Sequence, residues 1–474
     1  YSNPETVCNS VNTILRRLNI TKALASGKGY QKSGRSVTLL LMLIVMKLLK
    51  GNNSIHSMWI NNFYNFIESG KNGFYRFLLR PDTNWRRVLA YLSVRYRQAV
   101  EENGLSKPKT DACFIIDDTI LEKTGLTIEG VSKVFDHNIN KCVLGYKMLV
   151  LGYNDGISTQ ACDFSLHREN SRNNYGLSKR ERLKQREVSV DTSHPDSERK
   201  NELDMNKLNS TLLMLKRALH HDFKAKYLLA DSWFSSPEFI KNIRKVSKNS
   251  VDYLGIGRKE SVRYKVNGVG WTPRQIIERY SRQKARRNAK YRCEYFIMRC
   301  SVHDLPVKLF FIRSINGKEW SFIITTDMNI GFEKAYELYQ ARWTIEVLFK
   351  ECKQYFKLGK CQAEYFNEQI ADCTIVLITH SLVSLENRFS NYETLGGLFV
   401  EIGDQLTLMT LWQRIITLIV KMMKAISTLI NEPIFELMRR LIVMNHGELK
   451  ILFSIIKSEM ISETNNINKE AVIS

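Results

Sequence analysis

The stretch from Glu337 to Lys357, ELYQARWTIEVLFKECKQYFK, constrains the fold of this chain more than any other. It contains no Gly or Pro, so nothing in it breaks a regular backbone. Its apolar residues recur at steps of three and four: Leu338, Ala341, Ile345, Leu348 and Cys352. This period predicts an amphipathic helix that lies against a core.

Four residues of different chemistry occupy a second stripe of the same helix: Tyr339, Arg342, Glu346 and Lys353. At about 100° per residue they fall beside one another, next to the buried face. Such a helix can bring a carboxylate to a site while its cations hold a polyanion. A helix with a solvated, charged flank would show the same spacing, so the stretch alone leaves both interpretations open.

The spacing Tyr-x2-Arg-x3-Glu-x6-Lys resembles the signature of one branch of bacterial insertion-sequence DDE transposases, the Tyr-Arg-Glu-Lys branch of Tn5-type cut-and-paste enzymes. In that family the Glu is the third catalytic carboxylate, on the last helix of a ribonuclease-H-like core. The resemblance implies this role for Glu346. It also implies two further carboxylates upstream, each at the end of a strand.

Two short apolar runs fit that expectation. Cys113 to Ile116 predicts a buried strand that ends at Asp117, and Lys226 to Ala230 predicts another that ends at Asp231. An Asx turn leaving each strand is the simpler alternative. Both segments are similar to family motifs, Asp-x-Thr and ADSWF, and the resemblance implies that both Asp residues are catalytic. Asp117 is preferred to Asp118 because alternation along a strand turns the neighbour away.

Composition indicates the kind of partner. The 474 residues include 70 Lys and Arg against 48 Asp and Glu, a net charge of +22 that predicts a polyanionic partner. Membrane-surface binding is the competing interpretation, but no uncharged apolar run reaches the roughly 18 residues of a membrane helix. Nine scattered Cys without a CxxC pair favour reduced thiols and argue against a zinc site. We therefore expect a cytoplasmic protein, and the resemblance implies a bacterial, nucleoid-associated one.

We expect an α/β fold, with a ribonuclease-H-like catalytic core, a β-rich insertion before the last catalytic helix, and helical domains at both ends. The expected divisions are a helical DNA-binding domain (1–108), the first part of the core (109–257), the basic insertion (258–332), the last core helix (333–370) and a helical C-terminal domain (371–474). The C-terminal apolar helices, expected at 406–429, 433–443 and 448–461, fit a closed bundle or a dimerisation surface equally well. The basic residues of the N-terminal domain, and those of the polar loop at 167–200, could contact DNA or be merely solvated.

The insertion is the most basic part of the chain. Residues 258–300 hold 13 Lys and Arg against three Glu, which predicts a DNA-contacting surface. Trp320 immediately precedes the expected strand SFIITTD, where the family places a Trp that stacks on a flipped base. A Trp packed at the edge of a sheet is the alternative. The resemblance further implies that Tyr339, Arg342 and Lys353 hold phosphates around that base, and that Lys350 contacts the terminal phosphate.

Three carboxylates suit a site for two Mg²⁺ ions, which Mn²⁺ can replace, because both are hard cations that prefer oxygen ligands. The expected metal ligands are Asp117, Asp231 and Glu346. The resemblance implies nicking, hairpin formation and strand transfer at insertion-sequence ends, by a homodimer on paired double-stranded DNA ends. Two alternatives remain open: a metal-dependent nuclease of the same fold, and a catalytically inactive DNA-binding descendant.

Overall fold

The structure is a computed structural model. It describes residues 18–27, 37–51, 54–56, 71–106, 112–137, 139–169, 176–186, 193–258, 262–390 and 392–404. The chain divides into two compact units, Ser10–Glu401 and the combination of Tyr1–Asn9 with Ile402–Ser474. Nearly all described residues belong to the first unit. The helices expected at 406–429, 433–443 and 448–461 lie outside the described residues.

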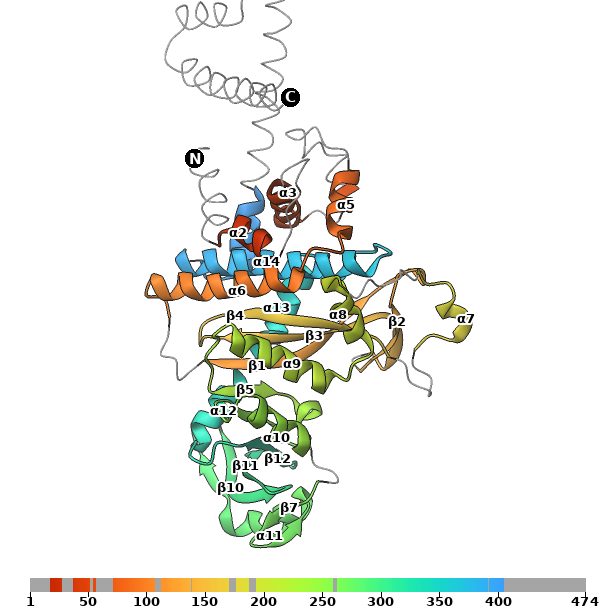
Figure 1. Cartoon of the computed structure of the whole chain (residues 1–474). Coiled ribbons are helices and arrows are strands. Elements are labelled where there is room, and N and C mark those ends of the chain that lie inside the picture. Colours follow the sequence, from red (N-terminus) through yellow and green to blue (C-terminus); the bar gives the residue numbers. More distant parts are fainter. Residues whose placement is uncertain are drawn as a thin grey trace, which may run out of the picture. The chain divides into compact units, whose positions relative to one another are not determined.

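A mixed sheet of twelve strands runs through the described part of the chain (Figure 1). Its strands are β1 (Cys113–Glu122), β2 (Ser132–Asp136), β3 (Lys141–Asn154), β4 (Thr159–His167), β5 (Tyr227–Ala230), β6 (Asp252–Ile256), β7 (Tyr264–Val266), β8 (Val269–Trp271), β9 (Arg286–Asn288), β10 (Cys293–Val302), β11 (Leu305–Ser314) and β12 (Ser321–Thr325). The main path is β2-β3-β1-β5-β6-β12-β11-β10-β7-β8, with β4 paired to β3 and β9 paired to β10.

The first half of this sheet has the order β4-β3-β1-β5-β6. Strands β1, β3 and β4 form an antiparallel meander. Strand β5 then runs parallel to β1, and β6 runs parallel to β5. A meander followed by parallel crossover strands is consistent with the expected ribonuclease-H-like domain.

The strands after β6 continue the same sheet. Strand β12 pairs antiparallel to β6, and β11 and β10 follow as successive antiparallel neighbours. One hydrophobic core runs along a single face of both halves, from Phe114 on β1 to Phe296 on β10. Helices α9 (Lys207–His220) and α10 (Pro237–Val246) contribute to this core, and α11 (Pro273–Lys284) adds Ile276 to it. The sequence did not predict α11, which begins with a capping box between Thr272 and Gln275.

Helices from both ends of the described chain pack together. Helix α14 (Phe366–Phe389) contacts α3 (Val37–Leu49), α5 (Asn72–Leu79) and α6 (Trp85–Glu102), while α2 (Ile20–Ser26) contacts α6. Both α6 and α14 contact β4, and Figure 1 shows them side by side above the sheet. Helix α14 spans the expected division at residue 370. None of the described helices combines the length and the apolar character needed to cross a membrane.

The remaining helices are short or belong to the site. They are α7 (Lys179–Arg182), α8 (Pro195–Asn201), α12 (Phe332–Gln340), α13 (Trp343–Gln354) and the 3-10 turns η2 (Glu202–Asp204) and η3 (Ser232–Phe234).

The stretch 337–357 is not one continuous helix, so the prediction of a single helix there is wrong. Helix α12 ends at Gln340 and α13 begins at Trp343. At the junction the backbone makes tighter i to i+3 bonds, from Ala341 N to Leu338 O and from Arg342 N to Tyr339 O. The Thr344 hydroxyl donates to Ala341 O (2.7 Å), and such a side-chain bond competes with the helical pattern.

Candidate active site

Asp117 and Asp231 each directly follow a residue that is paired between two neighbouring parallel strands, β1 and β5. The register pairs Ile116 of β1 with Ala230 of β5, and an Asp residue directly follows each of them in the sequence. Neighbouring strands lie about 4.8 Å apart. Ile116 and Ala230 both point into the core, so the residues after them point to the opposite face of the sheet.

Asp117 does not end its strand, contrary to the prediction. Strand β1 continues to Glu122 because β3 pairs with it along its whole length. Strand β5 ends at Ala230, so β1 loses its parallel neighbour at Asp117 and the sheet opens there. Asp231 then caps η3, where its Oδ1 accepts a hydrogen bond from Trp233 N (2.9 Å).

Arg342 joins Asp117 to Glu346. Its Nη1 lies 2.9 Å from Asp117 Oδ2, and its Nη2 lies 2.6 Å from Glu346 Oε1, one turn further along α13. Asp118 points elsewhere, since its Oδ2 lies 2.9 Å from Lys207 Nζ on α9. Alternation along β1 therefore separates the two neighbouring carboxylates, and only Asp117 contacts the Arg342 guanidinium.

Burial shapes the electrostatics of these acids. It raises the pKa of Asp117 to about 7, an effect that Arg342 opposes and the nearby Asp231 carboxylate reinforces. Burial likewise raises the pKa of Asp231, again opposed by Arg342. Burial raises the pKa of Tyr339, whose ring centroid lies 5.9 Å from Arg342 Cζ. Partly buried carboxylates that crowd together would be stabilised in their charged form by additional positive charge.

The donor set has the chemistry of a Mg²⁺ or Mn²⁺ site, because Asp117, Asp231 and Glu346 supply only hard oxygen ligands. Within the described residues, however, no group of three His, Cys, Asp or Glu side chains is spaced to hold a metal ion. Glu346 is joined to Asp117 through the Arg342 guanidinium, which supplies the positive charge between them. The three side chains therefore have the ligand chemistry that a divalent cation requires. In this structure, however, the Arg342 guanidinium forms ion pairs with two of the three carboxylates, those of Asp117 and Glu346.

A cavity of about 610 Å³ adjoins Arg342, a size typical of ligand pockets. Helices α12 and α13 line it on one side, and strands of the insertion line it on the other. Its walls are rich in aromatic and cationic side chains: Tyr291, Arg292, Tyr336, Tyr339, Arg342 and Trp343. Trp343 is 61% exposed. Sequence analysis missed it, although it directly follows Arg342 in the motif.

The structure does not bring Trp320 to this site. Trp320 is only 8% exposed and belongs to the hydrophobic core, with its ring 5.2 Å from that of Phe296. Ser321 and Ile323 line the cavity beside Tyr339, whereas Trp320 lies on the other face of the sheet. Its surroundings match the alternative of a packed Trp.

The two expected lysines lie further along α13. Lys350 is exposed one turn after Glu346. Burial lowers the pKa of Lys353, and the acids that oppose this effect are Glu122 and Asp136. The charge of Lys353 therefore interacts more strongly with Glu122, at the far end of β1, than with Asp117.

A second aromatic and basic group flanks Asp231. Trp233 is 41% exposed, and Lys207 Nζ lies 4.6 Å from the centre of its ring. Arg258 donates to the carbonyl oxygens of Ser232 (2.9 Å) and Trp233 (2.6 Å). Sequence analysis gave Trp233 and Lys207 no role, although Trp233 lies within the ADSWF motif.

Carboxylates at the open edge of a ribonuclease-H-like sheet, beside a basic and aromatic cavity, are the arrangement expected of an enzyme that acts on nucleic acid. Residues 198–382 match the family model of the transposase DDE domain. The matched segment contains Asp231 and Glu346 and ends within α14, while Asp117 precedes it. This match supports a DDE transposase. No curated protein sequence is significantly similar to the chain.

Proposed function

We propose that this chain is a DDE transposase that nicks DNA at the ends of its element and joins the released 3′-OH to target DNA. One observation carries the proposal: Asp117 and Asp231 directly follow Ile116 and Ala230, the last residues paired between the parallel strands β1 and β5, and a single guanidinium joins Asp117 to Glu346. The match of residues 198–382 to the transposase DDE domain supports it independently.

Asp117, Asp231 and Glu346 would hold the two Mg²⁺ ions, or Mn²⁺ in their place. When bound, these ions activate the attacking hydroxyl and stabilise the charge that develops on the phosphate. Arg342 touches the carboxylates and also lines the cavity, so it can hold a DNA phosphate next to them. Lys350 and Lys353 would extend this contact along the DNA backbone.

The basic insertion supplies the main DNA surface in this proposal. Every described Lys and Arg between residues 258 and 300 is exposed. Lys265 pairs with Asp304, Arg287 with Glu294 and Lys290 with Glu337. Because the cations of this segment outnumber its acids, the exposed surface can neutralise phosphates, and such neutralisation provides nearly all of the nonspecific affinity of a protein for DNA.

Hairpin formation and the Tn5-type cut-and-paste route belong to the same proposal, on the strength of the Tyr-Arg-Glu-Lys motif. A base displaced from the duplex would enter the cavity beside Tyr339 and stack on Trp343, because Trp320 is buried in the core. The helical segment up to residue 108 would grip the transposon end. A homodimer on paired ends would carry out the reaction on the bacterial nucleoid.

A metal-dependent assay on labelled element-end DNA tests the proposal. Asp231→Asn should abolish nicking with Mg²⁺ and leave DNA binding nearly unchanged, because the amide cannot supply a charged ligand. Asp222→Asn, at an exposed turn after α9, is the matched control and should nick at the wild-type rate.

The same assay separates the alternatives. A transposase yields both nicks and strand-transfer products, whereas a nuclease of the same fold yields nicks alone. Binding without any nicking by the wild-type protein would identify an inactive descendant. Wild-type nicking by Asp231→Asn would remove Asp231 from the site.

A further inference from the structure

The edge of the sheet that carries Asp117 and Asp231 has a second side, which faces away from Arg342. Successive residues of β1 point to opposite faces of the sheet, and Asp117 pairs with Arg342 on one of them. On the other face, Asp118 Oδ2 lies 2.9 Å from Nζ of Lys207, the first residue of α9. Helix α9 packs on the face of the sheet that holds the hydrophobic core. Arg342 and Lys207 therefore approach the proposed catalytic carboxylates from opposite faces.

Asp231 lies between these two sides. Burial raises the pKa of Asp231, an effect that Arg342 opposes and Asp118 reinforces, so the charges of both residues act on its carboxylate. The chain then enters η3, where Trp233 N donates a hydrogen bond of 2.9 Å to Asp231 Oδ1. The position of Trp233 is thus linked directly to that of a proposed metal ligand.

The Trp233 side chain is 41% exposed, although its surroundings hold it in place. Lys207 Nζ lies 4.6 Å from the centre of its ring. The ring of Phe234, which is buried in the core, lies 4.9 Å from that of Trp233. Arg258 donates to the carbonyl oxygens of Ser232 and Trp233, and because both acceptors are neutral it adds positive charge beside the indole. A fixed, exposed aromatic surface with two cations therefore adjoins the carboxylates.

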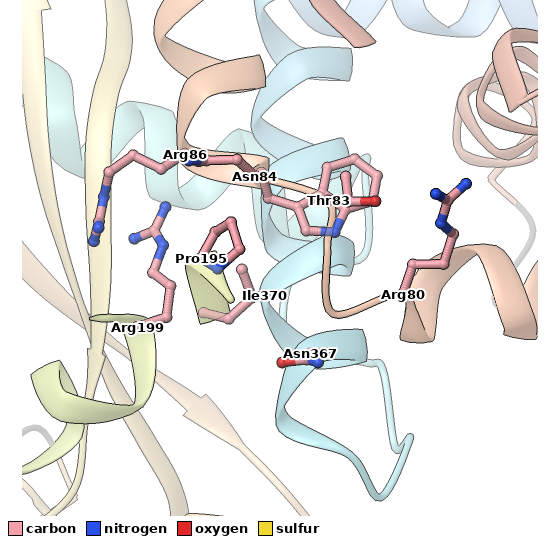
Figure 2. Close-up of a pocket in the computed structure, with 9 residues that line it drawn as sticks. Arg80, Thr83, Asn84, Arg86, Pro195, Arg199, Asn367 and Ile370 are labelled. Atoms are coloured by element: carbon pink, nitrogen blue, oxygen red, sulfur yellow. The ribbon is translucent and has the colours of Figure 1, made fainter. Parts of the chain in front are cut away.

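A buried ion cluster fixes α9 against the sheet. Arg217, in the last turn of α9, lies 2.6 Å from the carboxylate of Asp163 on β4. Asp163 is buried and also pairs with Arg86 of α6 and Arg199 of α8. Figure 2 shows the Arg199 guanidinium directed towards that of Arg86. Because these contacts hold the far end of α9, Lys207 keeps a fixed position at its start.

Strand transfer brings two DNA segments to one set of carboxylates. The attacking 3′-OH belongs to the element end and the attacked phosphate belongs to target DNA, with the attacking and leaving oxygens on opposite sides of the phosphorus. In the proposed function the element end occupies the face with Arg342 and Trp343. The opposite face presents the two kinds of group that bind unstacked DNA, a cation for a phosphate and an exposed aromatic ring for a base. These groups are Lys207 and Trp233.

We propose that Lys207 and Trp233 form the contact site for target DNA, in which the Lys207 ammonium pairs with a phosphate and a target base stacks on the Trp233 indole. This inference rests on the proposed function. In the step itself, the 3′-oxygen of the element end bonds to a target phosphorus, and its proton passes to solvent water. The bond from that phosphorus to the target 3′-oxygen breaks, and the released oxygen takes up a proton.

Strand transfer from pre-cut element ends into a target plasmid with Mg²⁺ tests this site in the full chain. Trp233→Ala should raise the target concentration that gives half of the maximal rate by about fivefold or more, since stacking of a base on an aromatic ring contributes at least about that factor. The dissociation constant of the element end, measured by fluorescence anisotropy, should change by less than about twofold. Trp233→Phe keeps an aromatic face and should restore most of the affinity for target DNA.

Lys207→Gln is an independent variant of the same site. It should also raise the half-saturating concentration of target DNA. It should reduce the slope of the logarithm of target affinity against the logarithm of salt concentration by about 0.9, the value expected for one lost phosphate contact. Lys216→Gln, the matched control, changes the charge on the exposed face of the same helix and should alter neither quantity.

The outcomes separate this site from the proposed function. Wild-type affinity for target DNA in both Trp233→Ala and Lys207→Gln, beside a wild-type protein that transfers strands, would overturn the target site and leave the transposase function intact. Weaker binding of the element end, with target affinity unchanged, would also overturn it, because the two residues would then contact the end. A wild-type protein that forms no strand-transfer product from pre-cut ends would contradict the proposed function itself.

Discussion

At the scale of single residues, the surroundings of each side chain separate groups that look alike in the sequence. Asp117 and Asp118 are neighbours, yet one contacts Arg342 and the other contacts Lys207. Trp320 and Trp343 both flank expected motifs, yet one is 8% exposed and the other 61% exposed. Alternation in a strand predicted the first distinction. The difference between the two tryptophans depends on where each side chain lies relative to the faces of the sheet, and the local sequence does not determine that.

Truncation of these two tryptophans should therefore have different effects. Loss of the Trp320 side chain should lower stability, whereas loss of the Trp343 side chain should lower activity on DNA. Trp320→Ala should lower the free energy of unfolding by about 3–5 kcal/mol, as expected for a large aromatic side chain removed from a core. Trp343→Ala should change it by less than about 1 kcal/mol and should impair processing of the DNA end instead. Chemical denaturation and end cleavage, measured on both variants, check the pair. A stable Trp320→Ala protein that fails only in hairpin formation would restore Trp320 as the base-stacking residue.

At the scale of elements, short buried strands were predictable because continuous apolar runs bounded by polar residues have few alternatives. The strands at β5 and β12 follow this rule. The length of β1 was not predictable, because its polar half is held by pairing with β3. The break between α12 and α13 was also hidden, since the apolar period continues through it and the Thr344 hydroxyl bond is a matter of geometry.

Strand β4 carries a pH-sensitive element. Burial lowers the pKa of His167 from 6.5 to about 4, and Lys207 acts in the same direction. Its Nδ1 lies 3.1 Å from Met205 O, so the neutral ring donates there, and its Nε2 lies 2.7 Å from Ser165 Oγ. Because the unfolded chain takes up the proton at a higher pH, this contribution to stability is complete above about pH 6.5. It is lost as the pH falls towards 4.

The free energy of unfolding should therefore fall by about 3 kcal/mol through this group over that range. Denaturant titrations at several pH values measure the total change. His167→Gln removes the titrating ring, so its pH dependence should be shallower by that amount. Identical pH profiles for the two proteins would show that His167 is not buried in its neutral form.

At the scale of the whole molecule, the order of the two strands and the helix that carry the three proposed carboxylates could be predicted from the sequence, and so could the concentration of basic residues in the insertion. The sequence did not predict that the insertion extends the core sheet through β12, because antiparallel pairing between distant strands leaves no local signal. The packing of the N-terminal helices against α14 could not be predicted for the same reason. The three carboxylates could be proposed from their motifs, whereas the Arg342 bridge between two of them could not.

The positive charge of the insertion should make the affinity for DNA depend strongly on salt concentration. The logarithm of the binding constant should fall steeply with the logarithm of salt concentration, by about 0.9 per neutralised phosphate. Arg282→Gln with Arg286→Gln, two exposed positions of the insertion, should reduce this slope by about 1–2. Lys224→Gln, exposed outside the insertion, should leave it unchanged. A flat response of the wild-type protein would exclude the insertion as a DNA surface.

The most direct test of the account is a crystal structure of the chain with Mn²⁺, located by its anomalous scattering. We predict metal bound by Asp117, Asp231 and Glu346 together, with the Arg342 guanidinium displaced from the two carboxylates that it now joins. An Arg342 that stays paired, with no metal peak beside Asp117 and Asp231 at saturating Mn²⁺, would contradict the proposed catalytic site.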